Sequence, residues 1–528
     1  MGNSNLVGFK KELRFSQLVI LGAGTGLGTG LLFSVFGMVT IGGGAAIIGA
    51  LIGSLIFIGV AVVVAEMGPV YLEAGAPARW SLYSHGRLAN LIIALSNYVA
   101  YLFIIPTEAL AVVEGLDFFA PSVLTPSGTP TILGAAIAVA IMLVLTPINY
   151  YGVRIFGKVT QWAGGIKLLI YFLLPVVLII VYFSPKNFTL GGFAPYGYVP
   201  VFAGIPLALF VFGGARIIAD YSAEIKDTKR ITLAIITAAL IEVAALILVY
   251  FAFTGGINWS KLSVAEGNFA GLSSVVSGNP FNFIAFKYGV LGFIVIAVIA
   301  AILGPLVDAW TVSGQGSRVL YSVAKSKAMP SRLLVLHERH AVPEWALLVT
   351  VAIGAVIAFI SAPLPTIYGL ITDAIVVFYL GFGINGISMI VSRRQGITKR
   401  RLPFGYVFAG IAFIGSSLGI FWSGWPSVPY GFLILLILAV FLGIIYKVKG
   451  EVKNSLWIIG YLAFLTIMAY IGSDGGLELL GYLWSSFIVL VVSAIVFLPL
   501  GVYSGISAEY LKSKILGVDT SAEKGGSN

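Results

Sequence analysis

The feature that most constrains this chain is a series of fourteen apolar runs, each long enough to cross a lipid bilayer as a helix. A helix rises about 1.5 Å per residue, so roughly 20 apolar residues cross the ~30 Å hydrocarbon layer. Strands of a membrane β-barrel would be about 10 residues long and alternate in polarity, which these runs do not. The predicted spans are 17–40, 43–66, 91–115, 130–148, 160–183, 201–221, 231–256, 288–316, 344–361, 366–391, 404–424, 428–446, 456–472 and 479–503.

Composition supports the same fold class, an all-α polytopic membrane protein. Of 528 residues, 59% are hydrophobic and only 10% are charged, whereas soluble proteins average about 25% charged residues. A water-soluble protein of this size could not bury so much apolar surface, so a nucleic-acid-binding module, a secreted disulfide scaffold and a disordered chain are all excluded. Cysteine is absent, which excludes thiol catalysis and thiolate metal sites.

The positive charges indicate how the chain crosses the membrane. If the N-terminus is cytoplasmic, 26 of the 31 Lys and Arg residues fall on the cytoplasmic side, and only Lys167 and Arg216 fall inside spans. Cytoplasmic loops are generally enriched in Lys and Arg. We therefore expect a multi-pass protein of the cell membrane, with cytoplasmic tails at 1–16 and 504–528.

Two predicted spans contain glycines that disfavour a continuous helix. Glycine occupies every second position from Gly22 to Gly30 in the first span, and each costs about 1 kcal/mol relative to alanine in a helix interior. The alternative is close helix packing, since small residues four apart form helix interfaces in membranes. A second interruption, Gly213-Gly214 in span six, favours broken helices.

The two interrupted spans are five crossings apart, so they run in opposite directions through the membrane. Secondary transporters with inverted repeats bind substrate at mid-membrane between two such broken helices. Freed helix ends offer amides to an anion and carbonyls to a cation, which suits a zwitterion such as an α-amino acid. The prediction is a ten-helix core at 17–400, with repeats at about 17–184 and 201–391. Four accessory helices follow at 401–503.

Two other motifs do not support a cofactor site. Gly152 to Lys158 has the spacing of a phosphate-binding loop, but Val159 replaces the magnesium-binding hydroxyl residue and no strand precedes it, so no ATP site is expected. His337 and His340 lack the spacing of a zinc helix. The sequence therefore predicts no metal, no cofactor and no enzymatic activity.

With both broken spans placed, four motifs between residues 17 and 401 resemble those of the amino acid-polyamine-organocation permeases. They are Gly26-Leu-Gly28-Thr29-Gly30-Leu-Leu-Phe33, similar to G-x-G-S-G-I-F; Glu66-Met-Gly68 with Glu73-Ala-Gly75-Ala-Pro; Phe212-Gly-Gly-Ala with Glu224 to Arg230, similar to F-x-G-F-E and E-x-K-N-P-x-R; and Arg318 to Ala324 with Met329-Pro330 and Pro343. The resemblance implies a LeuT-like 5+5 inverted-repeat core with broken helices 1 and 6. Family members usually have twelve spans, two fewer than predicted here.

The resemblance also implies which residues bind substrate. Backbone amides around Gly28, Thr29 and Gly30 would hold the substrate carboxylate. Carbonyls near Gly26, Phe210 and the Gly213-Gly214 interruption would hold the α-amino group, with Phe210 as an aromatic gate. On this basis, Gly28→Ala or Gly213→Ala is expected to abolish binding.

The two basic residues inside spans are assigned separate roles. Lys167 resembles the span-five lysine of proton-coupled, sodium-independent family members, which implies a proton carrier; the alternative is a lysine that extends to the cytoplasmic surface. Arg216 stands where the family pattern has Glu. A buried arginine must be paired, so Arg216 either forms a structural ion pair or has a function, in which it attracts an anionic substrate side chain or gates the pocket. Its candidate partners are Asp220, Asp308, Glu242, Glu108 and Asp373.

The predicted function is proton-coupled symport of α-amino acids by alternating access. An exchanger of amino acids, or of an amino acid for an amine, is the alternative, and a non-transporting amino acid sensor is a further one. The expected partners are an amino acid, protons and the lipid bilayer, without nucleic acid or ATP. The oligomeric state and the amino acid carried stay open.

Overall fold

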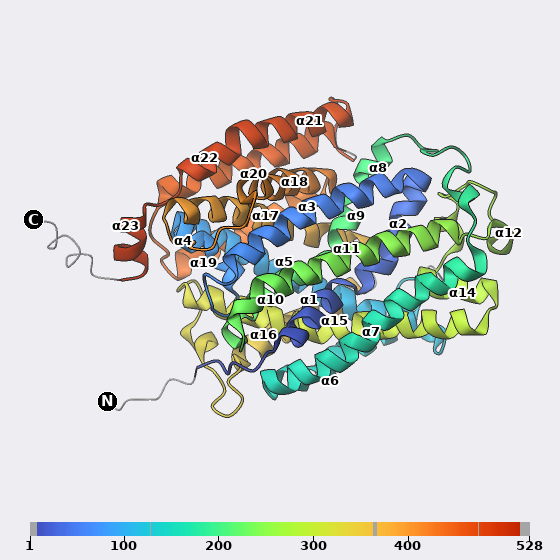
Figure 1. The fold of residues 1–528 in the computed structure, drawn as a ribbon, viewed down its shortest axis with the longest axis horizontal. Coiled ribbons are helices and arrows are strands. Elements are labelled where there is room, and N and C mark those ends of the chain that lie inside the picture. The colour runs from blue at the N-terminus through green and yellow to red at the C-terminus, as the bar shows by residue number, and fades with distance from the viewer. Residues whose placement is uncertain (1–7, 127, 363–366, 474, 518–528) are drawn as a thin grey trace, which may run out of the picture.

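The chain folds into a bundle of helices. The structure, a computed structural model, describes residues 8–126, 128–362, 367–473 and 475–517. Within these ranges the regular elements are helices, apart from two isolated β-bridges. Figure 1 shows the long helices lying side by side along the length of the molecule. The predicted all-α fold class is confirmed.

The number of membrane crossings agrees with the sequence. Thirteen helical stretches of the described residues are long and apolar enough to cross a membrane. The first, Phe15–Met67, has 53 residues, which is more than twice the length needed for ~30 Å of hydrocarbon. The chain turns back within it at Gly43–Ala45, where Gly43 has a φ of 56°. This stretch therefore supplies two crossings, and the total is fourteen.

The helices follow the predicted spans closely. Crossings one to five are α1 (Phe15–Gly26) with α2 (Thr29–Gly42), α3 (Ala46–Met67), α5 (Arg87–Leu116), α6 (Ile132–Tyr150) and α7 (Val153–Tyr182). Crossings six to ten are α8 (Val199–Ala203) with α9 (Ile205–Phe210) and α10 (Gly214–Asp220), α11 (Ile231–Gly255), α15 (Leu291–Lys325), α16 (Glu344–Ser361) and α17 (Ile367–Arg394). The last four are α18 (Gly405–Trp422), α19 (Ser427–Ile445), α20 (Val452–Gly472), and α21 (Tyr482–Val492) continued by Ser493–Phe497 and α22 (Leu498–Tyr503). The short helices are α4 (Trp80–His85), α12 (Trp259–Leu262), α13 (Leu272–Val275), α14 (Pro280–Tyr288) and α23 (Ala508–Tyr510).

Two helices are longer than predicted. Helix α7 begins seven residues before the predicted start of span five, and α15 continues nine residues beyond the predicted end of span eight. The two extra turns of α7 carry Arg154 and Lys158, which are exposed. The extension of α15 carries Arg318, which is buried and donates to Glu224 at 2.8 and 2.7 Å. A charged residue therefore does not mark the end of a helix when its charge is exposed to solvent or is paired with an opposite charge.

The two broken helices are joined at one end of the bundle. Helix α1 begins and α22 ends there, and we call this end the terminal side (Figure 1). Just before α1, the Leu13 amide donates to the Glu224 carbonyl at 3.0 Å, and the Lys226 amide donates to the Leu13 carbonyl at 2.9 Å. Leu13 and Ile225 form a parallel bridge here and both are buried. The segment before α1 is thus attached to the segment that follows α10.

A buried ion pair joins α3 to α17 on the terminal side. Arg393 Nε and Nη2 donate to the two carboxylate oxygens of Glu66 at 2.5 and 2.6 Å. We expect Arg393→Met to lower the free energy of unfolding by about 3–5 kcal/mol, because it leaves the Glu66 carboxylate buried and unpaired. Thermal unfolding of the purified protein in detergent measures this effect.

A matched control tests an exposed pair. Arg230 lies 3.3 Å from Asp227, and its side chain is 61% exposed. We expect Arg230→Met to change stability by no more than about 0.5 kcal/mol. Equal losses in the two variants would contradict a stabilising role for the Glu66 to Arg393 pair.

The four crossings after residue 400 form the last part of the bundle. In Figure 1, α18, α20, α21 and α22, coloured orange to red, lie along one edge of the molecule. Helix α18 packs against α3 and α17, so this part is in contact with the preceding helices. We propose that residues 17–400 are the transport core, with repeats at about 17–184 and 201–391, and that 401–503 are accessory.

Candidate functional site

The first span is broken at its centre. Helix α1 ends at Gly26 and α2 begins at Thr29, so Leu27 and Gly28 lie outside both helices. Leu27 has φ −98° and ψ 36°, and Gly28 has φ −78° and ψ −142°. The prediction of a broken first span is confirmed.

At three of the alternating glycines, the absence of a side chain lets a side chain from another helix approach the backbone at the break. A β-carbon placed on Gly26 would lie 2.0 Å from Glu242 Oε1, and one on Gly28 would lie 1.8 Å from Asp308 Oδ2. One on Gly30 would lie 2.8 Å from the ring of Phe210. Gly26 and Gly28 are therefore required by the close approach of carboxylates.

The sixth span is broken in the same way. Helix α9 ends at Phe210, Val211 to Gly213 lie outside the helices, and α10 begins at Gly214. A β-carbon on Gly214 would lie 1.7 Å from the Gly22 carbonyl oxygen of α1, whereas one on Gly213 would meet only Phe378, at 3.8 Å. The second predicted break is confirmed, but Gly214 rather than Gly213 makes the tight contact.

Lys167 lies beside the break of the first span. Its Nζ donates to Asp308 Oδ1 at 2.5 Å, and both side chains are buried. Because α7 begins at Val153, Lys167 lies about 21 Å along the helix, deeper than the predicted start implies. The structure therefore places this lysine in an ion pair inside the bundle and not at the cytoplasmic surface.

Two further carboxyl groups contact the broken helices. Glu108 Oε2 accepts from the Thr29 amide at 3.2 Å and from its hydroxyl at 2.8 Å. Glu242 Oε1 accepts from the Gly214 amide at 3.1 Å. Each therefore binds the first amide of a half-helix, where the helix dipole favours negative charge. The Thr29 amide, predicted to hold the substrate carboxylate, is here bound by Glu108.

Arg216 is fully buried in the first turn of α10. Its Nε lies 3.4 Å from Asp220 Oδ2, and its Nη1 donates to Asn97 Oδ1. Of the predicted partners, Asp220 forms the ion pair. Asp308, which was grouped with Arg216, instead pairs with Lys167 because α15 faces α7 at this level. The side chain of Asp373 lies outside the described residues.

Around the breaks, buried carboxyl groups outnumber buried cations. Two ion pairs, Lys167 with Asp308 and Arg216 with Asp220, leave Glu108 and Glu242 without a cationic partner among the described residues. Buried carboxyl groups without a cation are costly in their charged form. The site therefore contains more groups that can hold protons than cations that can neutralise them.

Glu108 and Glu242 were absent from the residues predicted for the site. Both are acids within long apolar runs, and an ionisable residue at such a position indicates a functional site by itself. The presence of an acid inside an apolar run would have identified both residues, because neither lies at the end of a span, where a charge could reach water.

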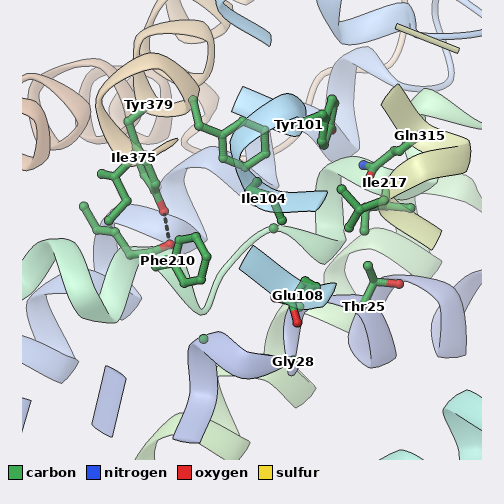
Figure 2. Close-up of a pocket in the computed structure, with 16 residues that line it drawn as sticks. Thr25, Gly28, Tyr101, Ile104, Glu108, Phe210, Ile217, Gln315, Ile375 and Tyr379 are labelled. Atoms are coloured by element: carbon green, nitrogen blue, oxygen red, sulfur yellow. Dashed lines mark hydrogen bonds between the residues drawn. The ribbon is translucent and has the colours of Figure 1, made fainter. Parts of the chain in front are cut away.

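A cavity lies between the two breaks. Figure 2 shows Phe210 and Glu108 on its walls, with Tyr101, Gln315 and Ile217 together at one end. The dashed line marks the bond from the Tyr379 hydroxyl to the Leu209 carbonyl, 3.0 Å long. Gly26, Gly28, Gly30 and Gly213 also line the cavity. Its volume is about 40 Å³, far below the roughly 300–1,000 Å³ of typical ligand pockets, so an amino acid must widen it.

The sequence between residues 13 and 469 matches the model of a known family, described as amino acid permease. The match includes both broken helices and the cavity between them. This chain belongs to the amino acid permease family. The permease is accordingly a multi-pass membrane protein, and the family it belongs to is one of transporters.

Curated relatives match the permease over most of its length. It is 28% identical over 517 residues to the glutamate/serine transporter AimA of Bacillus subtilis (strain 168), covering 94% of each chain. It is 26% identical over 486 residues to the aspartate-proton symporter of the same organism, covering 88% of this chain and 91% of the relative. It is 24% identical over 351 residues to a gamma-aminobutyric acid permease, covering 64% and 70%. The permease is thus similar to amino acid transporters along most of its sequence.

Proposed function

We propose that this permease is a proton-coupled symporter that carries α-amino acids across the cell membrane by alternating access. The observation that carries the proposal is the buried pair between Lys167 and Asp308, beside the break of the first span. Ionisable side chains inside a membrane protein commonly act as proton relays. A similar protein, the aspartate-proton symporter, supports the choice of proton as the coupling ion.

The substrate site of this proposal lies between the two breaks. The α-carboxylate binds amides of α2 at the first break, and the α-ammonium binds carbonyls of both breaks, because each freed helix end carries the complementary partial charge. The residues assigned to the site are Gly26, Gly28, Thr29, Gly30, Phe210, Gly213 and Gly214. Phe210 is the aromatic wall closest to Gly30.

Proton and substrate are coupled through Glu108. The Glu108 carboxylate and the substrate carboxylate compete for the same donor, the Thr29 amide. A protonated carboxyl accepts hydrogen bonds more weakly than a carboxylate does, so protonation of Glu108 frees this amide for substrate. Protonated Lys167 supplies the positive charge that compensates the carboxyl groups around it, so the mechanism does not require sodium.

The orientation follows from the distribution of Lys and Arg. We propose that the terminal side faces the cytoplasm, with the tails 1–16 and 504–528 on that side, because the topology predicted from the sequence assigns 26 of the 31 basic residues to the side of the N-terminus. Outside acid then loads the proton sites from the opposite end of the bundle.

The substrates to test first are glutamate, aspartate and serine. The relatives with the highest identity reported above are a glutamate/serine transporter and an aspartate-proton symporter. The alternative is an exchanger on the same scaffold, and the two differ in whether internal substrate is required. A sensor would bind amino acid without moving it.

The experiment uses the purified full-length permease in liposomes that contain neutral buffer only. We expect an acidic outside buffer to drive accumulation of labelled amino acid, and a protonophore to abolish it. Replacing sodium by potassium is expected to leave uptake unchanged. Uptake that ignores the pH gradient and requires internal amino acid would instead establish exchange, and binding without any flux would establish a sensor.

A further inference from the structure

A group of buried polar atoms surrounds Arg216 beside the cavity. The Arg216 side chain is fully buried, and its guanidinium faces the rings of Tyr101, Phe378 and Phe382 at 5.6, 5.1 and 5.4 Å. Arg216 Nη1 is bonded to Asn97, whereas Nη2 has no hydrogen-bond partner among the described residues. One of the two terminal nitrogens of the guanidinium therefore has no hydrogen-bond acceptor.

Three other residues, on the helices that contact Arg216, have unbonded polar atoms. Asp220 Oδ1 and Gln315 Oε1 are two of them, and both amide atoms of Asn385, on the helix that carries Phe378 and Phe382, are the third; all are on buried side chains. Asn385 lies on the same face of α17 as Phe378 and Phe382, since residues three, four and seven apart share a helix face. Buried polar groups in folded proteins nearly always have partners, so a cluster of this kind indicates a place where a polar ligand binds.

Comparison with the other buried arginines separates this cluster from a structural ion pair. Arg393 binds Glu66 through two bonds of 2.5 and 2.6 Å, and Arg318 binds Glu224 through two bonds of 2.8 and 2.7 Å. Arg216 instead meets Asp220 at one contact of 3.4 Å. The Asp220 oxygen at that contact also accepts from Tyr101 and Gln315. Arg216 is thus fully buried with an incomplete fork, whereas Arg79, the other buried arginine with an unbonded nitrogen among the described residues, is 8% exposed.

The cluster lies directly behind one end of the cavity. Tyr101, Gln315 and Phe378 line the cavity and also contact Arg216 or Asp220. Figure 2 shows Tyr101 and Gln315 together at that end, beside Ile217, which follows Arg216 in the chain. Arg216 is three residues beyond Gly213, about 5 Å along the helix axis. A substrate side chain of two or three carbon atoms covers that distance from the breaks.

We propose that Arg216 and its neighbours form a subsite for the side-chain carboxylate of an acidic amino acid, so that the permease selects glutamate or aspartate over their amides. The inference rests on the proposed function, since it names the substrate class of the same site. A planar guanidinium matches a carboxylate with two parallel hydrogen bonds. The cavity must widen to admit any amino acid, and turning the Tyr101 and Phe378 rings opens it toward Arg216.

The test compares acidic substrates with their neutral analogues. In proteoliposomes, glutamate and glutamine compete with the labelled amino acid, and the ratio of their half-inhibiting concentrations is measured. The double variant Arg216→Gln/Asp220→Asn removes both charges together and leaves no uncompensated charge. We expect the preference of the wild type for glutamate over glutamine to fall by roughly 10- to 100-fold, the value of hydrogen bonds between charged groups.

Two further variants separate recognition from structure. Arg230→Gln/Asp227→Asn makes the same changes in an exposed pair and is expected to keep the wild-type ratio. Arg216→Lys keeps the charge but not the fork, and we expect it to lose about tenfold in preference. A purely structural role would reduce competition by glutamate and glutamine equally, leave the ratio unchanged and overturn the proposal.

The wild type alone distinguishes the inference from the proposed function. If neutral amino acids are transported under a proton gradient and glutamate and aspartate do not compete, the acidic subsite is wrong and the symporter stands. If no amino acid is taken up, both are wrong. Strong competition by glutamate and aspartate, weaker by glutamine and asparagine, supports both.

Discussion

Alanine at position 28 is expected to abolish amino acid uptake. The new β-carbon would lie 1.8 Å from Asp308 Oδ2 and 2.9 Å from Glu108 Oε2, so it must displace both carboxyl groups and break the pair between Asp308 and Lys167. Breaking a buried pair costs about 3–5 kcal/mol, which corresponds to roughly 100-fold or more in rate or affinity. Uptake into proteoliposomes is the measurement, corrected for the amount of inserted protein.

The same broken span provides a matched control. Gly24 lies two residues before Gly26 and four before Gly28, and a β-carbon there would meet no carboxyl group and nothing closer than 3.7 Å. We expect Gly24→Ala to keep uptake near the wild-type level, and to stabilise α1 by about 0.5–1 kcal/mol because alanine is the better helix former. Loss of uptake in both variants would show that flexibility of the span, and not room for carboxylates, requires the glycines.

The second large effect is expected at Lys167. Lys167→Met removes the cation of the buried pair and leaves Asp308 unpaired, at a cost of about 3–5 kcal/mol. Uptake driven by outside acid is therefore expected to disappear, with some loss of stability. The double variant Lys167→Met/Asp308→Asn removes both charges, so we expect it to recover the stability.

The double variant separates coupling from folding. In liposomes loaded with the same amino acid, we expect it to exchange labelled for unlabelled substrate, because the backbone site at the breaks is intact. With buffer alone inside, outside acid is expected to cause no accumulation. Lys158→Met, on the exposed face of the same helix, is the control. Full accumulation by the double variant would remove Lys167 from the coupling mechanism.

Much of the fold follows from local sequence. Apolar runs of sufficient length predict the crossings, and glycines that disfavour a helix predict the breaks near Gly28 and Gly213. The early start of α7 could not be predicted from hydropathy, because Arg154 and Lys158 are compatible with an exposed helix face as well as with a loop. The crossings and the breaks thus follow from residue type alone, whereas a helix end that carries charged residues depends on whether those charges are exposed.

The contacts within the site could not be read from sequence. Lys167 and Asp308 are 141 residues apart, and their meeting depends on how α7 and α15 rotate about their axes. The same applies to Glu242, whose carboxylate enters the gap between Gly26 and Gly214. Residue types indicated that these groups are buried, but only packing determines which of them touch.

The contacts between α1 and α10 have a mechanical consequence. These half-helices touch where Gly214 approaches the Gly22 carbonyl, and the segments beyond them are joined by the bridge between Leu13 and Ile225. Because α1 and α10 are attached to each other at both ends, we expect them to move as one rigid body, here called the lever, with hinges at Gly28 and Gly213. Access from the terminal side then depends on one collective tilt, so a crosslink between this lever and α15 would stop the cycle in a single state.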